Sequence, residues 1–292
     1  MGMRVERPEV VRRVSESKVK YNEDWLKESV SGLGDGVGGM HWLIDGFFDK
    51  ALEFLVVDSG VVERRTWEAW VLAMQYQRAF FRVSMAESGS RVDCLVDHRV
   101  WNLSSRPLNS FFNAGDWPGA LFGAWTCRDF DYARFLADVP VEVLRSAGES
   151  QGTRFMRDAY AWVEVLQAFV KGDPRAGVLL EGARELADPG RASFAAGYAG
   201  LMAVPQMEVL GRLIERDGDG FNEALVRALE AYREYTAADL AKGGLSGIVP
   251  LELLGMACLV RDGRVEGVSL EVESDYFPEG ILDGRWLDAF PV

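Results

Sequence analysis

The chain has 292 residues, 48% of them hydrophobic, and 45 acidic residues against 32 basic ones give a formal net charge of −13. This composition supports a large core and excludes global disorder. The acidic balance disfavours direct binding to nucleic acid or to anionic membranes, because phosphates bind Lys and Arg. No apolar run approaches the roughly 20 residues that span a bilayer. No apolar block follows the charged N-terminus either, so no secretory signal is expected.

The three cysteines are far apart in the sequence and odd in number: Cys94, Cys127 and Cys258. They predict buried free thiols in a reducing compartment, which favours a cytoplasmic location over a disulfide framework. Cys94 and His98 are four residues apart in a predicted strand, which separates them by about 13 Å. No third soft ligand is close in sequence, so neither a metal site nor a cofactor is expected.

The N-terminal part of the chain differs in character from the rest. Residues 1–40 are expected to form a charged, exposed helix over 5–28 and a glycine-rich loop over 32–39. Residues 41–292 are expected to form a single helical domain.

The most apolar helix is predicted over residues 63–86, after a helix over 41–57. Trp67, Trp70 and Phe81 recur there at three- and four-residue steps, which is the period of one helix face. An aromatic stripe of this kind is typical of a core helix, and we interpret it so rather than as a ligand pocket.

Two short stretches alternate apolar and polar residues, which is typical of strands. They predict a small β element near residues 91–100 and 267–273. The sequence leaves open whether the two stretches pair with each other.

The rest of the chain predicts helices joined by short turns, over residues 117–128, 130–137, 141–146, 153–169, 176–186, 190–214, 221–241 and 249–260. Asp116 and Asp219 precede two of them, where a carboxylate can accept from the free N–H groups of the first turn. Short turns favour antiparallel neighbours. The expected fold class is therefore mostly α, built from packed antiparallel helical hairpins.

Three segments match functional motifs in their letters alone. Residues 34–39 match a dinucleotide fingerprint, but a charged helical stretch stands where a strand is needed. Residues 148–152 match a nucleophile elbow, yet both histidines come earlier in the chain. The segment that starts at Asp217 resembles a calcium loop, but Phe221 occupies a ligand position. With no catalytic residues apparent, the protein is not expected to be an enzyme.

Residues 266–288 stand apart, with seven acids, one base and interleaved aromatics. Exposed aromatics can anchor a basic protein partner while carboxylates speed the encounter. The alternative is a solvated acidic edge whose aromatics fold back onto the core, and the sequence leaves both open. The candidate partner-binding residues are Glu271, Glu273, Asp275, Tyr276, Phe277, Glu279 and Trp286.

The same region resembles the C-terminal signature of the immunity protein 49 family, in which an apolar helix with Ala-Cys-Leu-like residues precedes a Ser-Asp-Tyr-(apolar)-Pro segment. The apolar helix carries Val249-Pro250-Leu251 and Ala257-Cys258-Leu259. Phe277 stands where Leu is more usual, a small departure. The residues that match the motif, and that can be structural, are Ser274, Asp275, Tyr276 and Pro278.

The resemblance implies a largely helical immunity protein of a bacterial polymorphic toxin system, which binds and neutralises a cognate toxin domain in the cytoplasm of the producing cell. It supplies no catalytic residues. The acidic charge suits a basic toxin, and a nuclease is one such enzyme because its substrate is anionic. Two other hypotheses stay open: a helical-hairpin scaffold or regulatory module with several peptide partners, and an enzyme that uses carboxylates or a small-molecule pocket.

Overall fold

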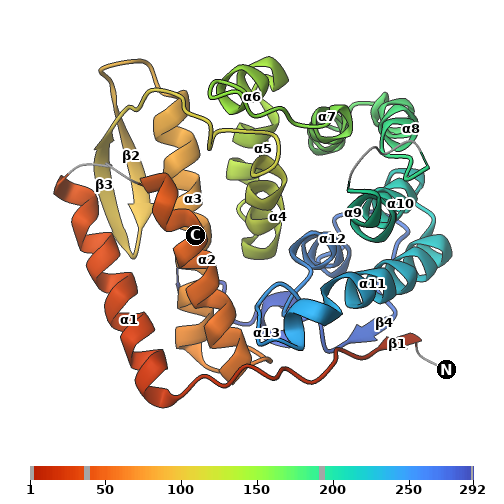
Figure 1. Cartoon of the computed structure of the whole chain (residues 1–292), viewed down its shortest axis with the longest axis horizontal. Coiled ribbons are helices and arrows are strands. Elements are labelled where there is room, and N and C mark those ends of the chain that lie inside the picture. Colours follow the sequence, from red (N-terminus) through yellow and green to blue (C-terminus); the bar gives the residue numbers. More distant parts are fainter. Residues whose placement is uncertain (1–2, 36–39, 191–194, 291) are drawn as a thin grey trace.

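The computed structural model describes residues 3–35, 40–190, 195–290 and 292. Within these ranges the protein is mostly helical, and its strands form two small two-stranded sheets. Helices that follow each other in the chain pack in pairs, α2 with α3, α7 with α8 and α10 with α11. The predicted fold class is confirmed (Figure 1).

The elements at the N-terminal end are β1 (Met3–Val5), α1 (Glu16–Ser31), a short 3-10 turn (Gly32–Asp35), α2 (Met40–Val57), α3 (Arg64–Met85), β2 (Arg91–Val96) and β3 (Arg99–Ser104). The remaining elements are α4 (Trp117–Cys127), α5 (Phe130–Ala137), α6 (Val141–Gly148), α7 (Arg157–Lys171), α8 (Ala176–Leu186), α9 (Ala196–Tyr198), a π turn (Ala199–Ala203), α10 (Val204–Glu215), α11 (Gly218–Leu240), α12 (Leu251–Arg261), β4 (Val272–Ser274) and α13 (Glu279–Leu282).

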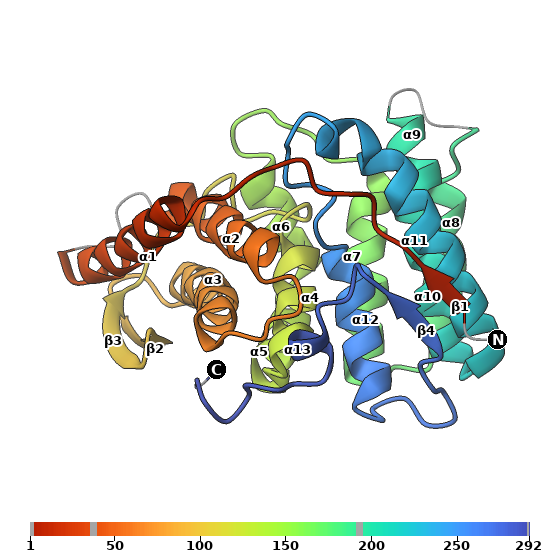
Figure 2. The same cartoon turned by 90° about the horizontal axis from the view of Figure 1, so that it is seen from below.

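The N-terminal segment is shorter in helix than the sequence predicted. α1 begins at Glu16 because Ser15 caps it, its hydroxyl accepting from the Lys18 N–H at 3.3 Å. The residues before α1 begin with β1, which pairs in parallel with β4, and then run extended across the body to Ser15 (Figure 2). The predicted helix over 5–28 was therefore wrong for its first part. Of the glycine-rich loop, residues 36–39 lie outside the described residues.

The predicted core helix is confirmed as α3. Its large aromatic side chains are buried, among them Trp67, Trp70 and Phe81. The Trp70 indole N–H donates to the Thr126 hydroxyl at 3.0 Å, which joins α3 to α4. The apolar stripe on α3 thus forms the centre on which the helices on either side pack.

The strand predicted over 91–100 is a β-hairpin. β2 and β3 pair antiparallel and are joined by Asp97 and His98, whose φ angles are 52° and 60°. Positive φ at both central residues is the geometry of the tight hairpin turn. The hairpin lies against α3 (Figure 1). The two predicted β stretches do not pair with each other, since β4 pairs with β1 instead.

Two predicted helix caps are different in the structure. The Asp116 side chain does not cap α4, because its carboxylate accepts from the Asn113 amide at 2.8 Å. The residue that caps α11 is Asp217 rather than Asp219, and it accepts from the Gly220 N–H at 2.9 Å. The helix therefore begins three residues earlier than Phe221.

A buried carboxylate fastens the N-terminal segment to α2. Glu53 is 3% exposed and accepts hydrogen bonds from the Asn22 amide, at 2.7 Å, and from the Arg12 guanidinium. The Lys18 ammonium lies 3.5 Å away. Burial raises the pKa of Glu53, but the hydrogen bonds from Asn22 and Arg12 outweigh burial and leave the pKa below its ordinary value.

Replacing this carboxylate should destabilise the fold. Glu53→Ala should lower the free energy of unfolding by about 3 kcal/mol, because it leaves Asn22 and Arg12 without their acceptor. Urea unfolding measures the loss, with Glu68→Ala as the control. Glu68 belongs to an exposed i,i+4 pair with Arg64, and its replacement should cost at most about 1 kcal/mol. Equal losses for the two variants would contradict this role for Glu53.

The same network has a definite pH dependence. Because the pKa of Glu53 is lower in the folded than in the unfolded state, its stabilisation is complete above the unfolded pKa. It is lost as the pH falls through the folded pKa. The difference in unfolding free energy between the wild type and Glu53→Ala should therefore shrink in acid, as urea titrations at a series of pH values would show.

Candidate partner-binding site

The acidic C-terminal segment packs with its apolar side chains inward and its carboxylates outward. Val272, Tyr276, Phe277 and Ile281 are buried. The Tyr276 ring meets the Tyr232 ring edge-on at 5.4 Å between centroids. Tyr276 and Phe277 are therefore not exposed anchors. For these two residues the second interpretation holds, in which the aromatic side chains fold back onto the core.

The other predicted residues are reachable from solvent. The side chains of Glu271, Glu273, Asp275 and Glu279 are exposed. Trp286 is half-buried, and its indole N–H donates to the carbonyl of Val61 at 3.0 Å. The four carboxylates lie within nine residues of each other along the chain, and the surface that they form is called the acidic edge below. Glu273 and Asp275 lie beside the same arginine, Arg4.

Two buried or half-buried polar side chains hold this edge in place. The Asn222 amide donates to the carbonyl of Ser269 at 2.9 Å and accepts from the N–H of Glu271 at 2.8 Å. The Ser274 hydroxyl donates to the carbonyl of Val5 at 2.7 Å and accepts from the N–H of Tyr276 at 3.2 Å. Asn222 and Ser274 thus position the backbone that carries the acids.

The approach of α13 to the body depends on a glycine. The N–H of Gly280 donates to the carbonyl of Gly60 at 2.9 Å. A Cβ at this position would collide with the carbonyl oxygen of Val61. Gly280 therefore allows the segment after Pro278 to lie directly on the turn between α2 and α3.

Arginines of the same chain neutralise much of the acidic edge. Arg4 lies 3.2 Å from Asp275 and 3.9 Å from Glu273, and Arg285 lies 3.4 Å from Glu279. Glu271 and Asp288 have no ion pair within the described part of the chain. Such exposed pairs are weak and screened by salt, so the carboxylates can exchange one cationic partner for another.

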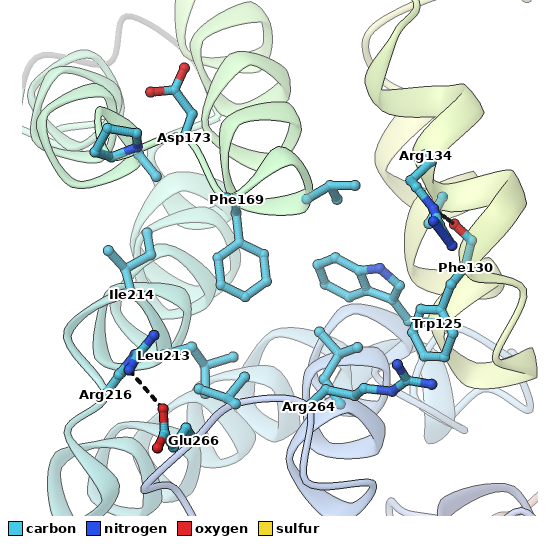
Figure 3. Close-up of a pocket in the computed structure, with 17 residues that line it drawn as sticks. Trp125, Phe130, Arg134, Phe169, Asp173, Leu213, Ile214, Arg216, Arg264 and Glu266 are labelled. Atoms are coloured by element: carbon cyan, nitrogen blue, oxygen red, sulfur yellow. Dashed lines mark hydrogen bonds and ion pairs between the residues drawn. The ribbon is translucent and has the colours of Figure 1, made fainter.

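A groove of about 890 Å³ begins beside Glu266, at the start of the acidic segment. Figure 3 shows Trp125 and Phe169 near its middle, and their rings meet edge-on at 5.9 Å. The Arg264 guanidinium lies 4.1 Å from the Phe130 ring centroid. Arg216 pairs with Glu266 at 3.1 Å.

The lining of the groove combines aromatic, aliphatic and charged side chains. No His, Cys, Ser or Lys is among the described residues that line it. Trp and Arg are the residue types that dominate binding energy at interfaces. Asp173 on its rim accepts from Arg175, which lowers the pKa of Asp173 to about 2 and keeps it ionised. Sequence reasoning missed this groove because its walls come from segments more than a hundred residues apart.

None of the three cysteines is among the described residues that line the groove. All three are buried free thiols, as predicted. Burial raises the pKa of Cys127 and Cys258 to about 12, so neither is ionised at neutral pH. In the part of the chain that the structure describes, no group of three His, Cys, Asp or Glu side chains has the arrangement of a metal site. No helix of the described ranges combines the length and hydropathy of a membrane span.

Fold and surface together define a helical protein with an acidic edge and an adjoining aromatic groove. The sequence model of the family described as immunity protein 49 matches residues 58–281, which is most of the chain. The chain belongs to the immunity protein 49 family. Neither the curated proteins nor the solved structures contain a match.

The match includes β4 and the Ser274 to Pro278 motif, while β1 precedes it. The motif residue Ser274 therefore bridges the matched region and the N-terminal segment. This placement gives the motif a structural role that can be tested by itself.

Ser274→Ala should loosen the pairing of β1 with β4. It removes one hydrogen bond to Val5 and one from Tyr276, which together should cost about 1–2 kcal/mol. Hydrogen–deuterium exchange should become faster over residues 3–5 and 272–276 and stay unchanged in α3. Ser146→Ala on α6, where the hydroxyl contacts a carbonyl in its own helix, is the control. Unchanged exchange in both strands would show that Ser274 does not hold them.

Proposed function

We propose that the protein is an immunity protein that binds a cognate toxin domain and neutralises it in the cytoplasm of the cell that produces both. The observation that carries the proposal is membership of the immunity protein 49 family over residues 58–281. The toxin belongs to a bacterial polymorphic toxin system. In this proposal, neutralisation occurs by binding rather than by catalysis.

The acidic edge is the proposed contact surface. Its exposed carboxylates are Glu271, Glu273, Asp275 and Glu279, and the half-buried Trp286 follows them in the chain. Tyr276 and Phe277 act on this surface from beneath, by fixing its backbone. A basic toxin would replace the arginines that now face these acids, and the net charge of −13 would accelerate its approach.

The chemistry of the partner follows from this charge. A protein that attracts a strongly acidic inhibitor carries a basic surface, and enzymes that act on nucleic acids carry such surfaces to bind phosphates. We therefore propose a basic nuclease as the toxin. Binding would then depend on salt, since exposed charges are screened beyond about 8 Å at physiological ionic strength.

Co-expression tests the proposal directly. The toxin domain encoded beside this gene is induced in a bacterial host with and without this protein. The expected result is rescue of growth together with a co-purified complex in a one-to-one ratio. Continued killing despite abundant folded protein, with no complex recovered, would contradict the pairing.

Charge reversal tests the acidic edge. Changing Glu273, Asp275 and Glu279 together to Lys should slow association with the toxin at least about tenfold at low salt, because steering is lost. The association rate of the wild type should also fall more steeply with salt than that of the variant. Stopped-flow or surface-based kinetics measure both.

The matched control reverses three acids that are also exposed and also paired with arginine elsewhere on the surface. These are Glu142 with Arg145, Glu181 with Arg184 and Glu223 with Arg227. The control has the same net charge as the test variant, so a difference between the two reports position. Equal association rates for both variants would show that the acidic edge is not the contact surface.

A further inference from the structure

A second cavity, of about 610 Å³, lies among α2, α3, α4 and the start of α12. Six aromatic side chains are among its described lining residues, including Phe48 from α2, Trp70 and Phe81 from α3, and Phe155 from the segment before α7. Its volume falls in the range of about 300–1,000 Å³ that is typical of small-molecule sites. It shares no lining residue with the groove beside Glu266.

Three carboxylates line this aromatic cavity, and no cation does. They are Asp45, Asp116 and Glu252, while no Lys, Arg or His is among the described lining residues. None of the three forms an ion pair within the described ranges. A ligand that complements the negative charge of these carboxylates would be a cation.

Two of these carboxylates lie at the cavity wall without a cationic partner among the described residues, where Asp116 is exposed and Glu252 is half-buried. Asp116 accepts one hydrogen bond from Asn113, at 2.8 Å. Partial desolvation raises the pKa of the Asp116 carboxyl, and the nearby Asp45 raises it further. Glu252 stands in the first turn of α12, where its own backbone N–H partly compensates it, and burial still raises its pKa. A bound cation would relieve both groups.

Glycines shape the space. A Cβ on Gly148 would lie 2.8 Å from the Cβ of Asn113, and one on Gly115 would lie 3.0 Å from the Phe155 ring, so the walls approach closely there. At Gly119 the situation is the opposite, because a Cβ would meet nothing within 4 Å. Gly119 therefore faces open volume, and a larger side chain at this position can be accommodated.

The lining distinguishes between kinds of cation. Asp45, Asp116 and Glu252 do not have the arrangement of a metal site. Aromatic faces attract ammonium and guanidinium groups, and apolar walls bury an organic body. We propose that this cavity is a binding site for a small organic cation, an amine carried on an apolar or aromatic body. The proposal concerns a site separate from the acidic edge and does not depend on the toxin.

Calorimetry on the full chain tests the site with a matched pair of probes. Phenylbutylamine carries the cation on an apolar body, and phenylbutanol has nearly the same shape without the charge. The amine should bind the wild type saturably at one site and at least about tenfold more tightly than the alcohol, because only the amine pairs with the carboxylates. Equal affinities for the two probes, or no saturable binding of the amine, would overturn the proposal.

Two variants locate the binding. Gly119→Leu fills the cavity and should abolish amine binding. Gly182→Leu on α8 is the matched control, since Gly182 is also a helical glycine whose Cβ would meet nothing within 4 Å. The control should bind the amine as the wild type does. Amine binding by Gly119→Leu with wild-type affinity would overturn the proposal.

Glu252→Gln identifies the charge that is recognised. It should weaken amine binding at least about tenfold and leave binding of the alcohol unchanged. Circular dichroism and urea unfolding establish that each variant is folded before its affinity is interpreted. If the amine fails to bind the wild type while Gly119→Leu alone abolishes the complex with a toxin, the cavity is a protein-binding socket and the proposal is wrong.

Discussion

The acidic edge depends on one constraint, the burial of the apolar side of the C-terminal segment. Val272, Tyr276 and Ile281 lie in the core, and removing such side chains from water is the main source of stability in a chain of this size. Once they are buried, the alternation of side chains places Glu273 of β4, and Glu271 directly before it, on the outward side. The polar contacts of Asn222 and Ser274 then select the register. The surface charge of the edge is a consequence of its packing.

This dependence explains why the fold was easier to predict than the site. The stripe on α3 repeats within a single helix, so a local period was sufficient to identify Trp67 and Trp70 as core residues. The partner of β4 is a strand about 270 residues earlier in the chain, and no local pattern encodes such a pairing. The inward orientation of Tyr276 also depends on a distant residue, Tyr232. The acids could be named from composition, whereas the orientation of the aromatics could not.

The hydrogen bonds of the aspartates before helices could not be predicted, for a different reason. Asp116 and Asp217 both stand directly before a helix, yet only the second accepts from a first-turn N–H. The side chain of Asn113 competes for Asp116, since its amide donates to that carboxylate at 2.8 Å. Hydrogen bonds of nearly equal energy decide such cases, and the balance is set by the local backbone. Because Asp116 accepts from Asn113 and does not cap α4, its carboxylate is among the groups that line the aromatic cavity.

The two carboxylate sets of this protein differ in what surrounds them. On the acidic edge, arginines of the same chain lie beside Glu273, Asp275 and Glu279, in water, where pairing costs little to break. In the aromatic cavity, Asp116 is exposed and Glu252 is half-buried. Partial desolvation raises the pKa of both, and no cation is among the described lining residues. Proteins depart from good packing and charge balance mainly where function requires it. By this argument the acidic edge suits rapid exchange of partners. The cavity instead contains carboxylates that lack a cationic partner in the described part of the chain, and a bound cation would supply that partner.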